Sequence, residues 1–202
     1  MNKIIELFKA NKNDIIKPVA VLLVICIVIP LALAVTNKVT EKRIDQLVRK
    51  NEKETMNRLI KADEFVSETY SKDNISFKYN TAKKDGEIKG YIFITAAKGY
   101  GGDVTVMTAV GTNGNISKIA VTDASGETPG LGQNVTKAKF YEQYKEKSNG
   151  VTVVKNGSGG KNTVDAVTGA TISSKAVNTA VREALENYEL ISKYTESEVV
   201  AE

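Results

Sequence analysis

The sequence contains no histidine and only one cysteine among its 202 residues. Without an imidazole, a Ser-His-Asp triad, a Cys-His pair and a zinc site built on histidine are all excluded. The single thiol, Cys26, lies in an apolar run, so no disulfide can form within the chain. Any redox or group-transfer chemistry therefore has to come from a bound cofactor.

The chain also lacks a strong charge of either sign and any internal repeat. Its 28 basic and 24 acidic residues leave a formal net charge of +4, and the lysines are scattered. No basic face for nucleic acid is therefore expected. With 42% hydrophobic and 26% charged residues, the chain is neither disordered nor wholly embedded in lipid. We expect one principal domain with an additional segment.

One long apolar run is present near the N-terminus. Residues 18–35 carry no charge, and as a helix they would cover roughly 27 Å of the ~30 Å core of a bilayer. We predict a transmembrane helix over residues 15–36, preceded by an arm of residues 1–14. A cleaved signal peptide is the alternative, because residues 32–34 resemble a signal-peptidase site. The run is, however, longer than the ~7–15 apolar residues of a typical signal.

Basic residues flank this run on both sides. Three lysines in the N-terminal arm, together with Lys17 just after it, favour a cytoplasmic arm, whereas the basic residues between positions 38 and 50 favour the opposite orientation. A long domain is translocated largely regardless of its charge. We therefore expect a single-pass protein of the cell (inner) membrane whose C-terminal domain is extracytoplasmic.

The remainder divides into a polar segment and a domain. Residues 37–70 lack Gly and Pro and have apolar residues at near-helical spacing, which predicts a helical stalk. Residues 71–202 contain turn signals and alternating patterns, with Asn113-Gly114 as a strong hairpin signal. Strands are predicted at 88–95, 104–110, 116–121 and 151–154, and helices at 136–144 and 173–188. This order predicts an α+β fold, an antiparallel sheet with flanking helices.

Two glycine-containing segments stand out, ETPGLG at residues 127–132 and GYGG at residues 99–102. Pro129-Gly130 predicts a type II turn, which leaves Glu127 and Thr128 unexplained. The second segment lies between two strands, where its glycines allow either a loop with positive φ or close approach to a ligand on which Tyr100 could stack. A third segment, residues 157–163, departs from a phosphate-binding P-loop and is predicted to be a surface loop.

The stretch DAVTGATISS, residues 165–174, holds four hydroxyl side chains just before a predicted helix. One hydroxyl would suffice as an N-cap, contributing about 1 kcal/mol, and the residues alone offer Ser173 or Thr171 for it. If Thr171 instead carries an ester, Ser173 or Ser174 is the expected cap. Gly169 and Ala170 keep the approach to the helix free of bulk. Because the N-terminus of a helix favours negative charge, the stretch suits a phosphate group, either bound or bonded as an ester to Thr171.

Residues 165–171, DAVTGAT, match the pattern Asp-x-x-Thr/Ser-Gly-Ala-Thr. This resembles the flavinylation motif of FMN-binding domains in the sodium-pumping NADH:quinone oxidoreductase and the Rnf electron-transport complexes. In that family a flavin transferase, using FAD, esterifies the final threonine to the phosphate of FMN. The resemblance implies covalent FMN at Thr171 and makes Asp165 the acidic residue that the transferase needs. The motif is completed by Thr168, Gly169 and Ala170.

Further features agree with the resemblance. The family has an ETPGLG segment beside the flavin, which implies flavin contacts for Glu127, Thr128, Gly130 and Leu131. It also has an aromatic–glycine turn like that at Tyr100 and Gly101. One transmembrane helix followed by an outward domain is the family's layout, and the short chain most resembles the G subunit of the Rnf complexes. One departure is that relatives often carry a histidine shortly before ETPGLG, which this chain lacks.

The resemblance implies an electron-transfer subunit of a redox-driven ion pump of the ferredoxin:NAD oxidoreductase type. Such a subunit is one relay among others and is not catalytic alone. The expected partners are the other subunits of the complex, the flavin transferase and the membrane, with no metal and no nucleic acid. Two alternatives stay open: a stand-alone membrane-anchored extracellular flavoprotein, and an anchored binding module without redox function.

Overall fold

The computed structural model describes residues 12–72, 74–155, 157 and 159–199, so most of the predicted N-terminal arm lies outside the described residues. The chain forms two compact units, Met1–Glu52 and Lys53–Glu202. A single helix, α2 (Lys12–Leu59), supplies the described part of the first unit and the beginning of the second.

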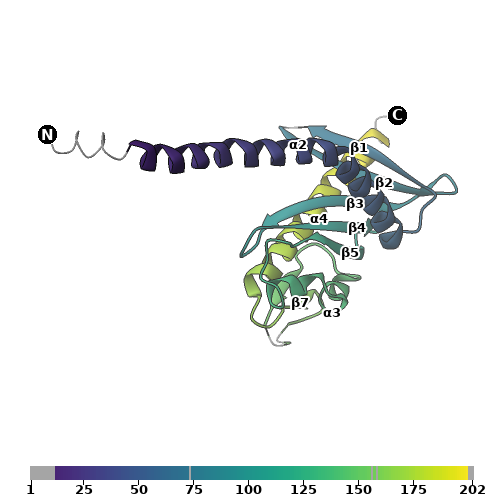
Figure 1. The fold of residues 1–202 in the computed structure, drawn as a ribbon. Coiled ribbons are helices and arrows are strands. Elements are labelled where there is room, and N and C mark those ends of the chain that lie inside the picture. The colour runs from purple at the N-terminus through teal and green to yellow at the C-terminus, as the bar shows by residue number, and fades with distance from the viewer. Residues whose placement is uncertain (1–11, 73, 156, 158, 200–202) are drawn as a thin grey trace. The chain divides into compact units, whose positions relative to one another are not determined.

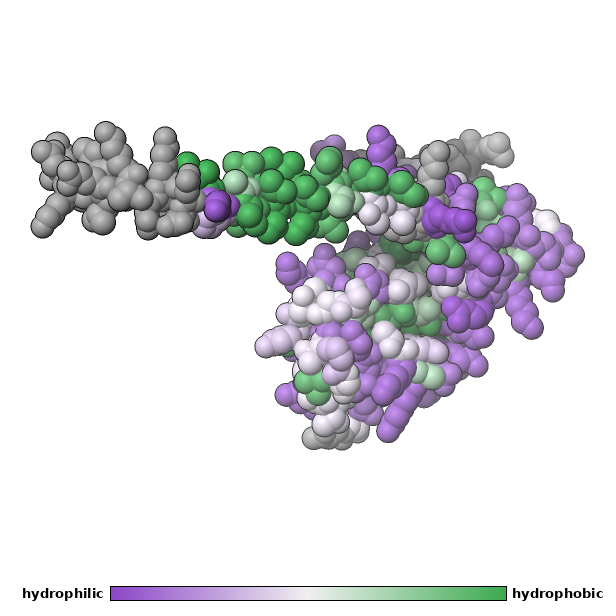
Figure 2. All heavy atoms as spheres, in the orientation of Figure 1, coloured by the Kyte–Doolittle hydropathy of each residue, from purple (hydrophilic) through white to green (hydrophobic). Residues whose placement is uncertain are grey.

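The first unit contains the apolar part of α2. Residues Ile16–Glu41, 26 in all, form a helix long and apolar enough to cross a membrane, at about 39 Å of rise. Its large apolar side chains are exposed, for example Leu31 at 63% and Leu33 at 66%. Figure 2 shows them as a continuous hydrophobic stretch. An apolar surface of this extent is typical of a membrane-embedded helix, which agrees with a membrane-anchored protein.

The predicted helical stalk extends too far. Helix α2 ends at Leu59, and residues beyond it form strand β1 (Glu64–Lys72), so the prediction of helix up to residue 70 is wrong. The apolar spacing that includes Phe65 belongs to this strand instead. Phe65 and Tyr70 point to opposite faces of the sheet, and each packs against a different core.

The second unit is built on five consecutive antiparallel strands. Strand β1 is followed by β2 (Ile75–Lys84), β3 (Glu87–Lys98), β4 (Asp103–Gly111) and β5 (Ile116–Asp123), in that order across the sheet. The predicted hairpin between β4 and β5 is confirmed, with Gly114 at φ +78° in its turn. The α+β fold with an antiparallel sheet is therefore confirmed.

Both faces of this sheet are covered, as Figure 1 shows for α4 (Thr171–Val199). Val177 and Val181 of α4 pack with Val106 of β4 on one face. On the other face, Leu59 at the end of α2 packs with Met107 of β4. Residues 104–110 of β4 are consequently buried almost without interruption, because alternate side chains enter two different cores.

Short elements connect β5 to α4. The predicted helix at 136–144 is divided into η1 (Gly132–Thr136), α3 (Ala138–Tyr141) and η2 (Glu142–Tyr144), which bury Phe140 and Tyr144 in edge-to-face contact. Strand β6 (Thr152–Val154) pairs in parallel with β7 (Thr163–Asp165), whereas the sequence predicted only antiparallel pairing. The last residue of β7, Asp165, is the first residue of the DAVTGAT motif.

Candidate functional site

Three segments identified separately in the sequence meet in the second unit: residues 99–102, 126–132 and 165–174. The segments approach one another most closely at glycine residues. A methyl group on Gly101 would overlap the carbonyl oxygen of Gly126, and one on Gly132 would lie 2.9 Å from Ser173 Oγ. Any side chain at these positions would separate segments that now touch. The glycines are therefore required by the assembly of the site.

Glu127 joins all three segments. Its side chain is only 2% exposed. Oε1 accepts hydrogen bonds from the N–H groups of Tyr100 (2.7 Å) and Gly101 (3.1 Å), and Oε2 accepts one from Ser173 Oγ (2.5 Å). Burial alone would raise the pKa of Glu127, but the bonds from Ser173 and from the backbone outweigh it and hold the pKa below its ordinary value. The ionised carboxylate of Glu127 thus links the Tyr100–Gly101 turn to the start of α4.

The predicted type II turn in ETPGLG is present. The N–H of Leu131 donates to the carbonyl of Thr128 (3.2 Å), and Gly130 has φ +75° at the third position, as such a turn requires. Asn134 of η1 donates from Nδ2 to the carbonyl of Gly130 (2.7 Å). The turn leaves Thr128 exposed and Leu131 42% exposed.

A second turn of the same kind lies inside the DAVTGAT motif. The N–H of Ala170 donates to the carbonyl of Val167 (2.9 Å), with Gly169 at φ +78°. A methyl group on Gly169 would lie 2.8 Å from Leu131 Cδ1, so the two turns are in contact. Ser174 Oγ accepts from the N–H of Val167 (3.0 Å) and donates to the carbonyl of Ala170 (2.9 Å), which fastens the turn to α4.

The four hydroxyls of the stretch have different surroundings. Ser173 and Ser174 are buried and bonded to Glu127 and to the motif turn, so the prediction that either caps α4 is wrong. Thr168 is exposed on the turn. Thr171 is the first residue of α4 and is half-buried. In the part of the chain that the structure describes, its hydroxyl makes no hydrogen bond. Thr171 therefore presents an available hydroxyl at the positive end of a helix.

Asp165 lies at the end of β7 on the far side of the motif turn. Its Oδ1 accepts from the N–H of Gly157 (2.7 Å), and the Oε1 of Gln143 accepts from its backbone N–H (2.8 Å). Beside it is a cavity of about 650 Å³, lined among others by Thr168, Lys137 and Lys139. The two ammonium groups give this cavity the charge that an anionic group would need. Neither lysine was identified from the sequence.

Three exposed apolar side chains belong to the same segments. Tyr100 is 73% exposed, Leu131 42% and Ile172 53%. Side chains of this size beside buried polar groups are typical of a ligand site with an apolar, planar occupant. The sequence predicted Tyr100 and Leu131 here. It offered no signal for Ile172, which follows Thr171 in the first turn of α4.

Comparison with known sequences agrees with this site. The FMN-binding domain family matches residues 99–186, which include all three segments. The G subunit of the proton-translocating ferredoxin:NAD(+) oxidoreductase complex of Clostridium ljungdahlii is 33% identical over 178 residues, 87% of this chain and 92% of that protein. The G subunit of the Na(+)-translocating ferredoxin:NAD(+) oxidoreductase complex of Acetobacterium woodii is 34% identical over 190 residues, covering 86% and 91% of the two chains.

Two crystal structures are also similar. NqrC of Shewanella oneidensis matches 57% of this chain and 61% of its own, with 25% identity and a TM-score of 0.46. The C subunit of the Na(+)-translocating NADH-quinone reductase of Parabacteroides distasonis matches 56% and 61%, with 29% identity and a TM-score of 0.49. From the sequence relatives, which match over nearly their whole length, the chain belongs to the Rnf/Nqr G-subunit family of ion-translocating oxidoreductase complexes and carries its FMN-binding domain.

Proposed function

We propose that this chain is an electron-transfer subunit of a membrane ion pump of the ferredoxin:NAD oxidoreductase type, and that FMN is attached to Thr171 by a phosphoester. The names of the relatives and the FMN-binding domain support the first part. Because these relatives are named as subunits of complexes, they favour a pump subunit over a stand-alone flavoprotein.

The observation that carries the second part is the contrast between Thr171 and its neighbours. Ser173 and Ser174 are buried and already bonded, whereas the hydroxyl of Thr171 is half-exposed and unpaired within the described residues. It is also located at the N-terminus of a 29-residue helix, whose free N–H groups and dipole stabilise a negatively charged phosphodiester.

The ester would form by a balanced exchange. The Thr171 oxygen bonds to the FMN phosphorus of FAD, the pyrophosphate bond breaks, and AMP leaves while the hydroxyl proton is released. When bound, FMN supplies the one-electron chemistry that no side chain of this protein provides. Tyr100, Leu131 and Ile172 would cover the apolar face of the cofactor. Glu127 would act as a positioning residue, because protein groups already occupy both of its oxygens.

Maturation and orientation are part of the proposal. A flavin transferase would recognise the motif through Asp165, which is exposed at the end of β7. The membrane-anchored chain would keep its N-terminal arm in the cytoplasm and its second unit outside. A covalent bond would there prevent loss of the cofactor by dilution.

The attachment is tested by co-expressing the chain with a flavin transferase and measuring in-gel fluorescence and intact mass after denaturation. We expect a fluorescent band, and an intact mass larger than that of the polypeptide by one FMN less one water. Thr171→Ala should be dark, and Thr171→Ser should retain flavin. The matched control is Thr179→Ala, because Thr179 is exposed on the same helix two turns further on and should be dispensable. A wild-type mass equal to the polypeptide alone would refute covalent attachment.

A further inference from the structure

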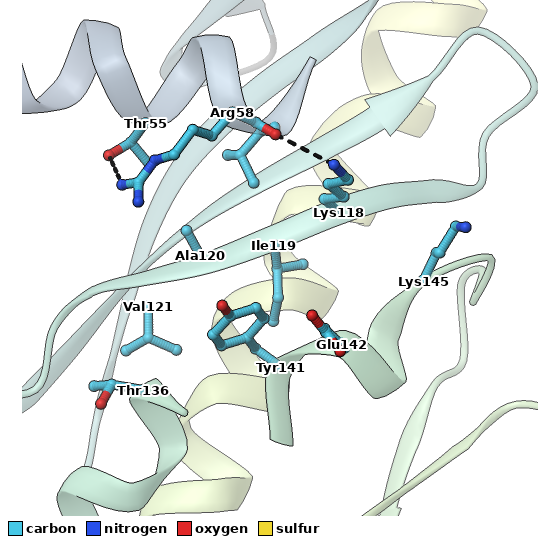
Figure 3. Close-up of a pocket in the computed structure, with 11 residues that line it drawn as sticks. Thr55, Arg58, Lys118, Ile119, Ala120, Val121, Thr136, Tyr141, Glu142 and Lys145 are labelled. Carbon is cyan, nitrogen blue, oxygen red and sulfur yellow. Dashed lines mark hydrogen bonds between the residues drawn. The ribbon is translucent and has the colours of Figure 1, made fainter. Parts of the chain in front are cut away.

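A second cavity lies along the edge strand β5, wholly within the second unit, and takes its lining residues from both cores. Its volume is about 650 Å³. Figure 3 shows the residues that line it: Thr55 and Arg58 in the last turn of α2, strand β5 from Lys118 to Val121, and Thr136, Tyr141, Glu142 and Lys145 on and just after the short helices that follow β5. None of these residues belongs to the three segments around Thr171.

The polar rim of this cavity is positively charged. Three cationic side chains, Arg58, Lys118 and Lys145, and one carboxylate, Glu142, line it, and Lys145 Nζ also lies 4.0 Å from Oε1 of Glu146. Arg58 Nη2 donates to Thr55 Oγ1 (3.0 Å), and Lys118 Nζ donates to the backbone carbonyl of Arg58 (3.4 Å). Among the residues that the structure describes, neither Arg58 nor Lys118 forms an ion pair with an acidic side chain. Their charges are consequently available to an external carboxylate.

The floor of the cavity is apolar and is formed from both sides of β5, with Leu59 from one core and Ile119, Val121 and Tyr141 from the other. Leu59 is 7% exposed and Ile119 is 3% exposed, while Val121 and Tyr141 are half-buried. Cationic groups around an apolar floor complement a chain segment in which a carboxylate stands beside an apolar side chain. A hydrophilic anion alone would leave the floor in contact with water.

Helix η1 connects this cavity to the candidate flavin site. Its first residue, Gly132, is close to Ser173 beside the motif, and its last residue, Thr136, lines the cavity. Four residue steps of a 3₁₀ helix span about 8 Å. An occupant of the cavity would therefore be close to a cofactor at Thr171.

We propose that this cavity is the docking site for an acidic, partly apolar segment of another subunit of the same complex. The inference rests on the proposed function, since it makes the docked subunit an electron-transfer neighbour of Thr171. Family membership supplies the need for such contacts, because the relatives are subunits of complexes. The excess of positive charge and the apolar floor specify the chemistry of the partner.

The test uses the purified, intact complex and a carbodiimide, which joins amines directly to carboxylates. We expect mass spectrometry to identify Lys118 or Lys145 linked to an Asp or Glu of another subunit. Absence of such a link, or links only within this chain or to a second copy of it, would overturn the proposal.

Charge reversal gives a second measurement. Arg58→Glu combined with Lys118→Glu should increase release of this subunit from the complex at low salt by about tenfold. The matched control is Lys78→Glu combined with Lys84→Glu, two exposed lysines of β2 that do not line the cavity, which should leave the complex unchanged. Reversing the cross-linked acidic residue of the partner to Lys should restore binding.

Flavin fluorescence of the same subunit separates this inference from the proposed function. A charge-reversed subunit that still carries flavin but stays in the complex like wild type would refute the docking site alone. A wild-type subunit without flavin would refute the attachment at Thr171, whatever the cross-links show.

Discussion

At the scale of single residues, Glu127 has the most connections in the candidate site. A carboxylate that is 2% exposed remains ionised because it accepts three hydrogen bonds from the protein. A hydrogen bond to a charged group contributes about 1.5–3 kcal/mol, which offsets the cost of desolvation. Glu127 thus holds the Tyr100 turn against the start of α4.

Replacing Glu127 by Gln should lower the free energy of unfolding by about 2 kcal/mol at pH 7, because an amide cannot accept all three bonds. The pKa of Glu127 is depressed from its ordinary value of 4.5, so its ionised form stabilises the fold above that value. This contribution is lost as the pH falls through the folded-state pKa. The difference between wild type and Glu127→Gln should therefore shrink below about pH 4.5.

Urea unfolding of the detergent-solubilised chain, followed by tyrosine fluorescence, measures this difference, since every tyrosine lies within residues 53–202. Glu142→Gln, at an exposed position, is the control and should show little effect at either pH. A constant difference across the acid range would contradict the assignment of Glu127 as the stabilising carboxylate.

At the scale of elements, the packing of α4 on the sheet depends on two buried threonines with different partners. Thr95 of β3 donates from Oγ1 to the carbonyl of Ala180 in α4 (2.7 Å). Thr108 of β4 is 0% exposed, and its hydroxyl has no hydrogen-bond partner in the described part of the chain. A buried hydroxyl without a partner is a cost, whereas a bonded one is not.

Substitution by Val, which has a similar shape, should therefore have opposite effects at these two positions. Thr108→Val should raise the free energy of unfolding by about 1 kcal/mol, and Thr95→Val should lower it by about 1–2 kcal/mol. Thermal unfolding of the two variants in parallel is the measurement. A loss of stability in both would show that Thr108 does have a partner, such as a buried water.

At the scale of the whole molecule, the chain combines an apolar span with a domain. The candidate flavin-site residues of this domain lie mainly in the loops between its strands and helices. The side chains of the span, Ile16–Glu41, are exposed along its length, as expected for a helix that lies among lipid or other membrane helices. The flavin site proposed here is built from three loops at one end of the sheet. The side of the membrane on which the second unit lies decides which partners can reach it.

Orientation can be measured by cysteine labelling in a Cys26→Ser background. Thr112→Cys, in the exposed turn between β4 and β5, should react in intact cells with a membrane-impermeant maleimide. Asn11→Cys, in the N-terminal arm, should react only after permeabilisation. The reverse pattern would place the second unit in the cytoplasm and contradict the proposed orientation.

Features that depend on neighbours in the sequence were predictable. The apolar run, the Asn113-Gly114 hairpin and the type II turn at Pro129-Gly130 follow from local composition and allowed φ values. The short motifs likewise marked three loops before their arrangement was known. The stalk prediction failed near Phe65 because apolar spacing over a few residues fits both a helix and a strand with partly buried side chains on both faces.

Contacts between distant segments were decided only by the tertiary structure. Ser173 reads locally as a helix cap, yet it bonds to Glu127, 46 residues away. Leu131 lies against Gly169 because two separate turns pack together. The amino-acid sequence by itself determined which residue types stand at each turn. Folding decided which hydroxyls are buried and bonded and which one, at Thr171, remains available, because burial depends on what the rest of the chain places beside each group.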